Sequence, residues 1–171
     1  MILPKLIITD IDGVWTDGGM YYDQSGNEWK KFNTSDSAGV LFCKLLNIPV
    51  CIITGENTEI VKRRSEKLKI EYLYQGISNK LIVAQELCQK LNITLNEVAH
   101  IGDDLGDFEL LKAVGFSCAP SNASIYIQKI VHHVTPIKGG DGAFRAFVEE
   151  ILTRTGNLET TIELALNHYK K

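Results

Sequence analysis

Two aspartates lie directly after an apolar run near the start of the chain. The run covers residues 6–9, and Asp10 and Asp12 follow it in the order Asp-Ile-Asp-Gly-Val. A spacing of two is the period of an extended chain, so both carboxylates can point into the same space. Two anions held that close require a cation such as Mg²⁺, and a carboxylate beside that ion can attack phosphorus. The pair therefore predicts phosphoryl transfer or, without a chemical role, an Asp-rich turn at Gly13.

Other polar residues follow two later apolar runs. Thr54, Gly55 and Glu56 come after the first of these runs, and the acidic sequence Gly-Asp-Asp-Leu-Gly-Asp at 102–107 comes after the second. Lys80 begins an amphipathic stretch between them. Taken singly, each has a structural explanation as a helix cap, a solvated lysine or an acidic helix start. Together they are predicted to meet at the carboxyl edge of a parallel sheet, where ligands bind.

The elements that must position these residues alternate along the chain. β-rich runs at 6–9, 50–54, 98–101 and 116–119 are almost wholly apolar, as in strands buried on both faces, and 72–74 and 132–135 are weaker strand candidates. Helical patterns cover residues 38–46, 59–68, 81–91, 108–114, 143–152 and 157–171. The alternation predicts an α/β fold, a Rossmann-like parallel sheet with helices on both faces.

One segment interrupts this alternation. Residues 18–32 contain two β-prone runs around a turn-prone Gln-Ser-Gly-Asn, which predicts a β-hairpin inserted after the first strand. Five of its residues, Met20, Tyr21, Tyr22, Trp29 and Phe32, are costly to leave in water. A hairpin this apolar is expected to pack on another subunit.

Length and composition limit the class of protein. The 171 residues suit a single domain spanning 1–171, and a net charge of −3 without a basic stripe argues against a nucleic-acid partner. The four cysteines occur singly in apolar stretches, as in a reduced, cytoplasmic protein. No segment is long enough to predict a membrane span.

The order Asp-x-Asp-Gly, Thr-Gly, Lys and Gly-Asp-Asp-x-x-Asp resembles the haloacid dehalogenase superfamily of aspartate-nucleophile phosphatases. The likeness extends over about residues 6–145. Within that superfamily the chain is similar to the small, capless group that acts on phosphorylated 2-keto-3-deoxy sugar acids, because it shares Tyr74-Gln75-Gly76, Asn79-Lys80 and the late glycine motif at 139–142. The resemblance implies a Mg²⁺-dependent phosphatase and a homotetramer whose hairpins meet.

The resemblance also implies roles for individual residues. Asp10 is the nucleophile and Asp12 the general acid and base, and Mg²⁺ is held by the Asp10 carboxylate, the Asp12 backbone carbonyl and Asp103. Thr54 and Lys80 bind the phosphoryl oxygens, and Gly55 is a further candidate for binding the substrate. Asp104 and Asp107 position Lys80 and metal-bound water.

Two departures from the group concern the substrate. The group's 3-deoxy-manno-octulosonate 8-phosphate phosphatases resemble one another in an Arg after Thr-Gly and a basic residue where Ser35 stands, and this chain has Glu56 and Ser35. Glu56 resembles the pattern for the nine-carbon 2-keto-3-deoxynononate 9-phosphate, which is therefore the expected substrate. The octulosonate 8-phosphate and the sialic acid N-acetylneuraminate 9-phosphate are alternatives. Arg64 and Lys67, three apart on one predicted helix, are candidates for the substrate carboxylate.

Two other functions compete with this interpretation. A phosphoacceptor receiver domain uses similar residues, but its second acidic site precedes the Thr and the Lys, whereas Asp103 here follows both Thr54 and Lys80. A non-catalytic oligomerisation module is the second alternative. The presence of every catalytic position argues against that module.

Overall fold

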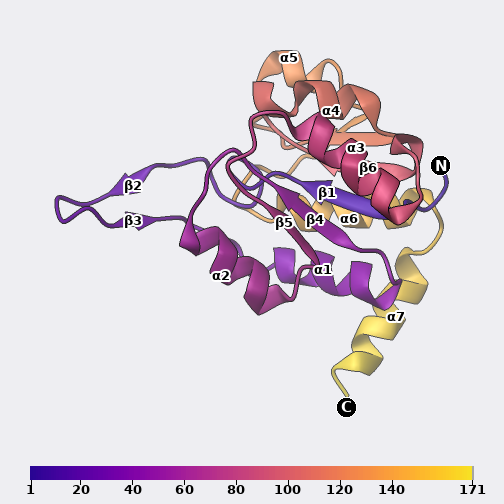
Figure 1. Cartoon of the computed structure of the whole chain (residues 1–171). Coiled ribbons are helices and arrows are strands. Elements are labelled where there is room, and N and C mark those ends of the chain that lie inside the picture. Colours follow the sequence, from indigo (N-terminus) through magenta and orange to yellow (C-terminus); the bar gives the residue numbers. More distant parts are fainter. Residues whose placement is uncertain (171) are drawn as a thin grey trace.

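The computed structural model describes residues 1–170. In this part of the chain, six parallel strands form one sheet in the order β5-β4-β1-β6-β7-β8. The strands are β1 (Leu6–Thr9), β4 (Val50–Ile53), β5 (Tyr72–Tyr74), β6 (Val98–Ile101), β7 (Phe116–Ala119) and β8 (His133–Val134). Every neighbouring pair is parallel, so all the carboxyl ends lie on one edge (Figure 1). The predicted Rossmann-like α/β fold is confirmed.

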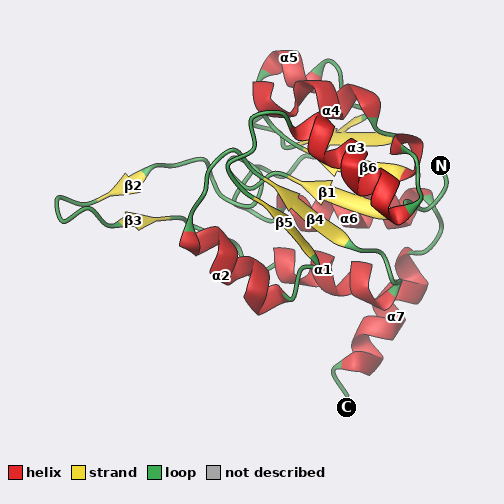
Figure 2. Ribbon diagram, viewed as in Figure 1, coloured by secondary structure: helices red, strands yellow, loops and turns green. Residues whose placement is uncertain are grey.

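Helices cover both faces of this sheet, as Figure 2 shows. One face packs against α1 (Asp36–Leu45), α2 (Glu59–Leu68) and α6 (Ala143–Arg154), and the other against α3 (Lys80–Leu91) and α4 (Phe108–Ala113). The shorter α5 (Ile125–Gln128) lies beside α4, and α7 (Leu158–His168) contacts α1 and α6. Two 3₁₀ turns, Leu95–Glu97 and Leu105–Asp107, precede β6 and α4.

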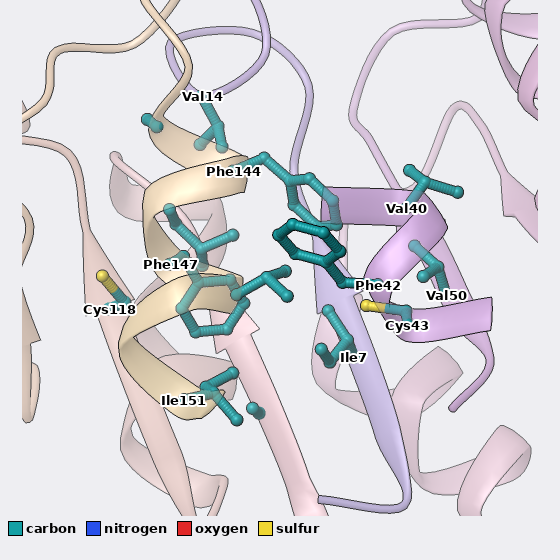
Figure 3. Close-up of a cluster of buried hydrophobic side chains, with 14 of the residues drawn as sticks. Ile7, Val14, Val40, Phe42, Cys43, Val50, Cys118, Phe144, Phe147 and Ile151 are labelled. Carbon is teal, nitrogen blue, oxygen red and sulfur yellow. The ribbon is translucent and has the colours of Figure 1, made fainter. Parts of the chain in front are cut away.

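Alternate residues of each central strand supply the two halves of the core. Ile7 of β1 faces α1 and α6, whereas Leu6 and Ile8 face α3 and α4. On the α6 side the rings of Phe144 and Phe147 fill the space between α6, β1 and α1 (Figure 3). Strands buried on both faces explain why their sequences are continuously apolar.

The inserted hairpin consists of β2 (Tyr21–Tyr22) and β3 (Glu28–Trp29), paired antiparallel. It projects away from the sheet and the helices (Figure 1). A bridge between Thr16 and Phe32 closes its base. Four of its large apolar side chains are exposed over 42–61% of their surface: Met20, Tyr21, Tyr22 and Trp29.

Most element bounds agree with the sequence prediction to within two residues, and the α5 helix is the main element that the prediction omits. It has only four residues, too few for a helical period to show. The predicted final helix begins one residue later and ends at His168. No helix within residues 1–170 is long and apolar enough to cross a bilayer.

Candidate active site

The carboxyl ends of β1, β4 and β6 place the predicted polar residues around one open cleft. Its volume is about 410 Å³, within the usual range for a small-molecule site. Most of the predicted site residues line it: Asp10, Asp12, Thr54, Gly55, Glu56, Lys80, Asp103, Asp104 and Asp107. Segments up to 97 positions apart in the chain, from Asp10 to Asp107, therefore form one site.

Lys80 forms the positive centre of the cleft. Its Nζ atom lies 2.9 Å from Asp10 Oδ1 and 2.8 Å from Asp107 Oδ1, and its side chain is almost wholly buried at the start of α3. His100, fully buried on β6, has Nε2 3.1 Å from Asp107 Oδ1 and Nδ1 3.2 Å from the carbonyl oxygen of Ile8. His100 thus contacts Asp107 on the buried side of the cleft and helps to fix its position, and Asp107 in turn fixes Lys80.

Three carboxylates of the cleft can hold a divalent metal ion. Oxygen atoms of Asp10, Asp103 and Asp107 all lie within 4.8 Å of one another. Both oxygens of Asp107 already accept hydrogen bonds, one from Lys80 and the other from the backbone N–H of Asp103. By contrast, Asp103 Oδ1 is buried and accepts no hydrogen bond from any residue in 1–170, and the buried Asp10 Oδ1 has only the ammonium of Lys80 beside it. An all-oxygen set in which a buried carboxylate oxygen has no donor fits Mg²⁺.

The electrostatics of these carboxylates agree with a site for a cation. Burial and the charge of Asp107 raise the pKa of Asp10 well above its usual range and raise the pKa of Asp103 to about 7. Burial alone raises the pKa of Asp107 too, but the hydrogen bond from His100 and the charge of Lys80 lower it to about 2. Asp103 therefore lacks the close positive partner that Asp10 and Asp107 share in Lys80.

Two glycines allow the loop after β1 to approach the metal ligands. Gly13 has φ +82°, and a Cβ atom there would lie 2.0 Å from Asp103 Oδ2. A Cβ on Gly139, in the late glycine motif, would lie 1.9 Å from the carbonyl oxygen of Gly13. The backbone N–H of Gly140 also donates to the carbonyl oxygen of Val14, at 3.1 Å. The late glycine motif therefore packs against the loop that carries Asp10 and Asp12.

Asp12 has a partner that the sequence analysis did not identify. Lys30, which directly follows β3 of the hairpin, donates to Asp12 Oδ1 at 2.7 Å and to Glu56 Oε2 at 2.6 Å. Thr16 Oγ1 donates to the same Asp12 oxygen at 3.2 Å. The acidic residues Glu28, Asp12 and Glu56 surround Lys30, but only a folded hairpin base brings them together. The sequence signal that could have indicated a further cation at this place is the excess of carboxylates around the predicted cleft.

The remaining cleft residues come from two loops. Thr54 is buried directly after β4, Gly55 and Glu56 follow it, and all three line the cleft together with Lys80. Asp104 is exposed at the rim, where its Oδ1 accepts from Tyr126 at 2.6 Å. Asp107, and not Asp104, contacts Lys80 directly.

Arg64 and Lys67 do not line this cleft. Arg64 is half-buried on α2, where its Nη2 donates to the carbonyl oxygen of Asn33 at 3.2 Å and to Ser37 Oγ at 3.1 Å. Its guanidinium carbon lies 5.9 Å from the Trp15 ring centre. Lys67 is exposed, and both residues line a separate depression beside Phe32. Their assignment to the substrate carboxylate stays a prediction.

Comparisons with known proteins agree with this geometry. A family model described as haloacid dehalogenase-like hydrolase matches residues 55–147. The 3-deoxy-D-manno-octulosonate 8-phosphate phosphatase of Salmonella typhi is 41% identical over 155 residues, which cover 91% of this chain and 82% of that protein.

Solved structures show the same likeness. The crystal structure of 3-deoxy-D-manno-octulosonate 8-phosphate phosphatase from Yersinia pestis has a TM-score of 0.88 and 40% identity, over 91% of this chain and 84% of that one. The Moraxella catarrhalis enzyme of that name, crystallised with a magnesium ion, a phosphate ion and a KDO molecule, has a TM-score of 0.90 and 34% identity. This match covers 94% of this chain and 92% of that one.

Proposed function

The chain belongs to the haloacid dehalogenase-like hydrolases and is a phosphatase with Mg²⁺ as its cofactor, and we propose that it hydrolyses 3-deoxy-D-manno-octulosonate 8-phosphate. The main observation in favour of this substrate is that the chain is 40–41% identical, over 91% of its length, to phosphatases whose names contain 3-deoxy-D-manno-octulosonate 8-phosphate. The cleft supports the proposal with a complete set of carboxylates around one buried lysine.

We assign the first chemical step to Asp10 and Asp12. An oxygen of Asp10 attacks phosphorus, and the bond between phosphorus and the sugar oxygen breaks as the aspartyl phosphate forms. Asp12 gives its proton to the leaving sugar oxygen. In the second step Asp12 takes a proton from water, whose oxygen attacks the same phosphorus, and Asp10 leaves as a carboxylate with inorganic phosphate released.

Charge on the phosphoryl group is stabilised by the cations and dipoles of the cleft. Lys80, already 2.9 Å from Asp10, and the Thr54 hydroxyl would bind phosphoryl oxygens. The residues that would hold Mg²⁺ are Asp10 and Asp103 through their side chains and Asp12 through its backbone carbonyl. When bound, Mg²⁺ supplies positive charge that neutralises the phosphoryl oxygens in transfer.

The expected preference for 2-keto-3-deoxynononate 9-phosphate is less well supported than the octulosonate alternative, because the relatives reported above carry the octulosonate name. The inference from Glu56 treated it as an unpaired anion that repels a substrate carboxylate. In the structure Glu56 pairs with Lys30, and this cation offsets its charge. That pairing weakens the argument for the nine-carbon substrate.

One observation keeps the nine-carbon phosphate as a second candidate substrate. Glu56 lines the cleft directly after Thr54 and Gly55, where an acidic group can accept hydrogen bonds from sugar hydroxyls. Replacing Glu56 with Arg tests it. If Glu56 contacts the sugar, the variant changes the ratio of kcat/KM between the nine- and eight-carbon phosphates. The expected change corresponds to about 1–3 kcal/mol of discrimination. An unchanged ratio contradicts that contact.

A turnover comparison tests the proposed function itself. The three substrates are octulosonate 8-phosphate, nononate 9-phosphate and N-acetylneuraminate 9-phosphate, each at saturating Mg²⁺. The proposal expects the highest kcat/KM with octulosonate 8-phosphate. A preference of about tenfold or more for either nine-carbon phosphate, which corresponds to about 1.4 kcal/mol, overturns it.

A further inference from the structure

We propose that Lys30 is a positioning residue that holds the Asp12 carboxylate in the orientation its proton transfers require. This inference rests on the proposed function, because it takes Asp12 as the general acid and base. It adds a residue of the inserted hairpin to the machinery of a site otherwise built on strand ends.

The contacts of Lys30 are those of a fixed cation. Its side chain is only 3% exposed, although it comes from a hairpin whose other large side chains face solvent. The Nζ atom lies 2.7 Å from Asp12 Oδ1 and 2.6 Å from Glu56 Oε2, with Glu28 Oε1 farther away at 3.7 Å. The ammonium therefore joins the loop after β1 to the loop after β4 across the cleft.

These contacts give the two carboxylate oxygens of Asp12 different hydrogen bonding. Oδ1 accepts from both Lys30 and Thr16, so that oxygen is fully engaged. Oδ2 is buried and accepts no hydrogen bond from residues 1–170. An anchored oxygen beside a free one fixes the plane of the carboxylate, and we assign the proton to Oδ2. General acid–base catalysis depends on such placement within hydrogen-bond reach of the leaving oxygen.

Stability alone is a poor explanation for Lys30. Removing an ammonium from water costs several kcal/mol, and apolar residues of similar volume often stabilise such a position equally well or better. The next residue, Lys31, illustrates the ordinary alternative, because it is 59% exposed and its nearest carboxylates are 3.9 and 4.0 Å away. These adjacent lysines directly after β3 thus have opposite environments, and of the two only Lys30 contacts Asp12.

The test compares Lys30→Met with Lys31→Met as a matched control, both as the full chain with Mg²⁺. The probes are p-nitrophenyl phosphate and octulosonate 8-phosphate, and circular dichroism checks the fold. We expect Lys30→Met to lower kcat about 10- to 100-fold, a part of what acid–base catalysis contributes, with KM changed less than about threefold. Lys31→Met should retain the wild-type kcat. If Lys30→Met does not fold, Lys30→Gln takes its place, because it keeps one hydrogen bond.

A double-mutant cycle separates positioning from general damage. In the Asp12→Asn background, Lys30→Met should lower kcat less than about twofold, because the group that Lys30 orients can no longer transfer a proton. The same loss in both backgrounds, or a Lys30→Met protein as active as Lys31→Met, overturns the proposal. Absence of sugar acid phosphate turnover in the wild type would contradict the proposed function instead, and p-nitrophenyl phosphate would still report on Lys30.

Discussion

At the scale of single residues, the carboxylates of the cleft differ because their partners differ. Asp107 has Lys80, His100 and a backbone N–H as donors, and its pKa falls to about 2. Asp103 is partly buried beside it, and its pKa rises to about 7 because burial and the charge of Asp107 oppose ionisation. Identical side chains four positions apart therefore differ in pKa because their partners differ.

Asp10→Asn should abolish turnover without unfolding the protein. The aspartyl phosphate cannot form without the Asp10 carboxylate, and we expect kcat to fall by several orders of magnitude. The fold should persist, because Lys80 keeps its contact with Asp107 and burial already opposes a charge at Asp10. Steady-state kinetics and a thermal melt of the same sample check both parts. Turnover near the wild-type rate would contradict the role of Asp10 as nucleophile.

Asp36 offers a pH test outside the cleft. It is fully buried at the start of α1, where its Oδ1 accepts the backbone N–H of Arg145 at 3.0 Å. Burial raises its pKa to about 6, against that hydrogen bond and the charge of Arg64. At about pH 2 to 3 the carboxyl is protonated in both states. As pH rises to 6 the unfolded chain ionises first, so the folded state loses up to about 3 kcal/mol.

Asp36→Asn should remove this pH-dependent loss. The amide oxygen can still accept from Arg145, and no charge is left to bury. We expect the free energy of unfolding of the variant, relative to wild type, to increase by about 1–3 kcal/mol between pH 4 and pH 7.5. Urea unfolding at the two pH values measures it. A constant difference between the proteins would show that Asp36 is ionised in the folded state throughout this range.

At the scale of elements, the parallel strands explain why acidic residues far apart in the sequence could be predicted to form one site. Residues 6–9, 98–101 and 116–119 are strands with the bounds expected from the sequence, because strands buried on both faces are continuously apolar. Parallel strands align their carboxyl ends, so Asp10 and Asp103 had to meet. Lys30 was not predictable in this way. Its position depends on how the hairpin base closes through Thr16 and Phe32, and no local period encodes that closure.

The metal site between the ends of β1 and β6 can be tested by stability. Mg²⁺ that binds the folded state raises the melting temperature, and a concentration 100 times the Kd contributes about 2.7 kcal/mol. We expect Asp103→Asn to lose most of this stabilisation, since Asp103 Oδ1 is a free buried oxygen. Asp141→Asn is the matched control, because Asp141 lies outside the cleft and its side chain is 58% exposed. Equal melting shifts with Mg²⁺ in both variants would contradict the assigned ligand.

At the scale of the whole molecule, the hairpin is the feature that a monomer explains least. Met20, Tyr21, Tyr22 and Trp29 are 42–61% exposed on an arm that extends away from the body of the protein. Such a concentration of exposed apolar residues marks an interaction site, and association of identical copies is the commonest arrangement. The same arm carries Lys30 to Asp12, so an interface that fixes the arm would also steady the cleft.

The resemblance of the sequence to the capless phosphatase group implies four copies, and we predict a homotetramer in which the hairpins meet. Light scattering at micromolar concentration should give about four times the 19.1 kDa mass of the chain. Replacing both Tyr22 and Trp29 with Ser should dissociate it, since the hairpin then loses two of its four large exposed apolar side chains. Tyr169→Ser is the control, because Tyr169 is 76% exposed near the other end of the chain and should leave the mass unchanged. A monomeric wild type, or a double variant that keeps the wild-type mass, would contradict the hairpin interface, and the exposed aromatic residues would then need a different partner.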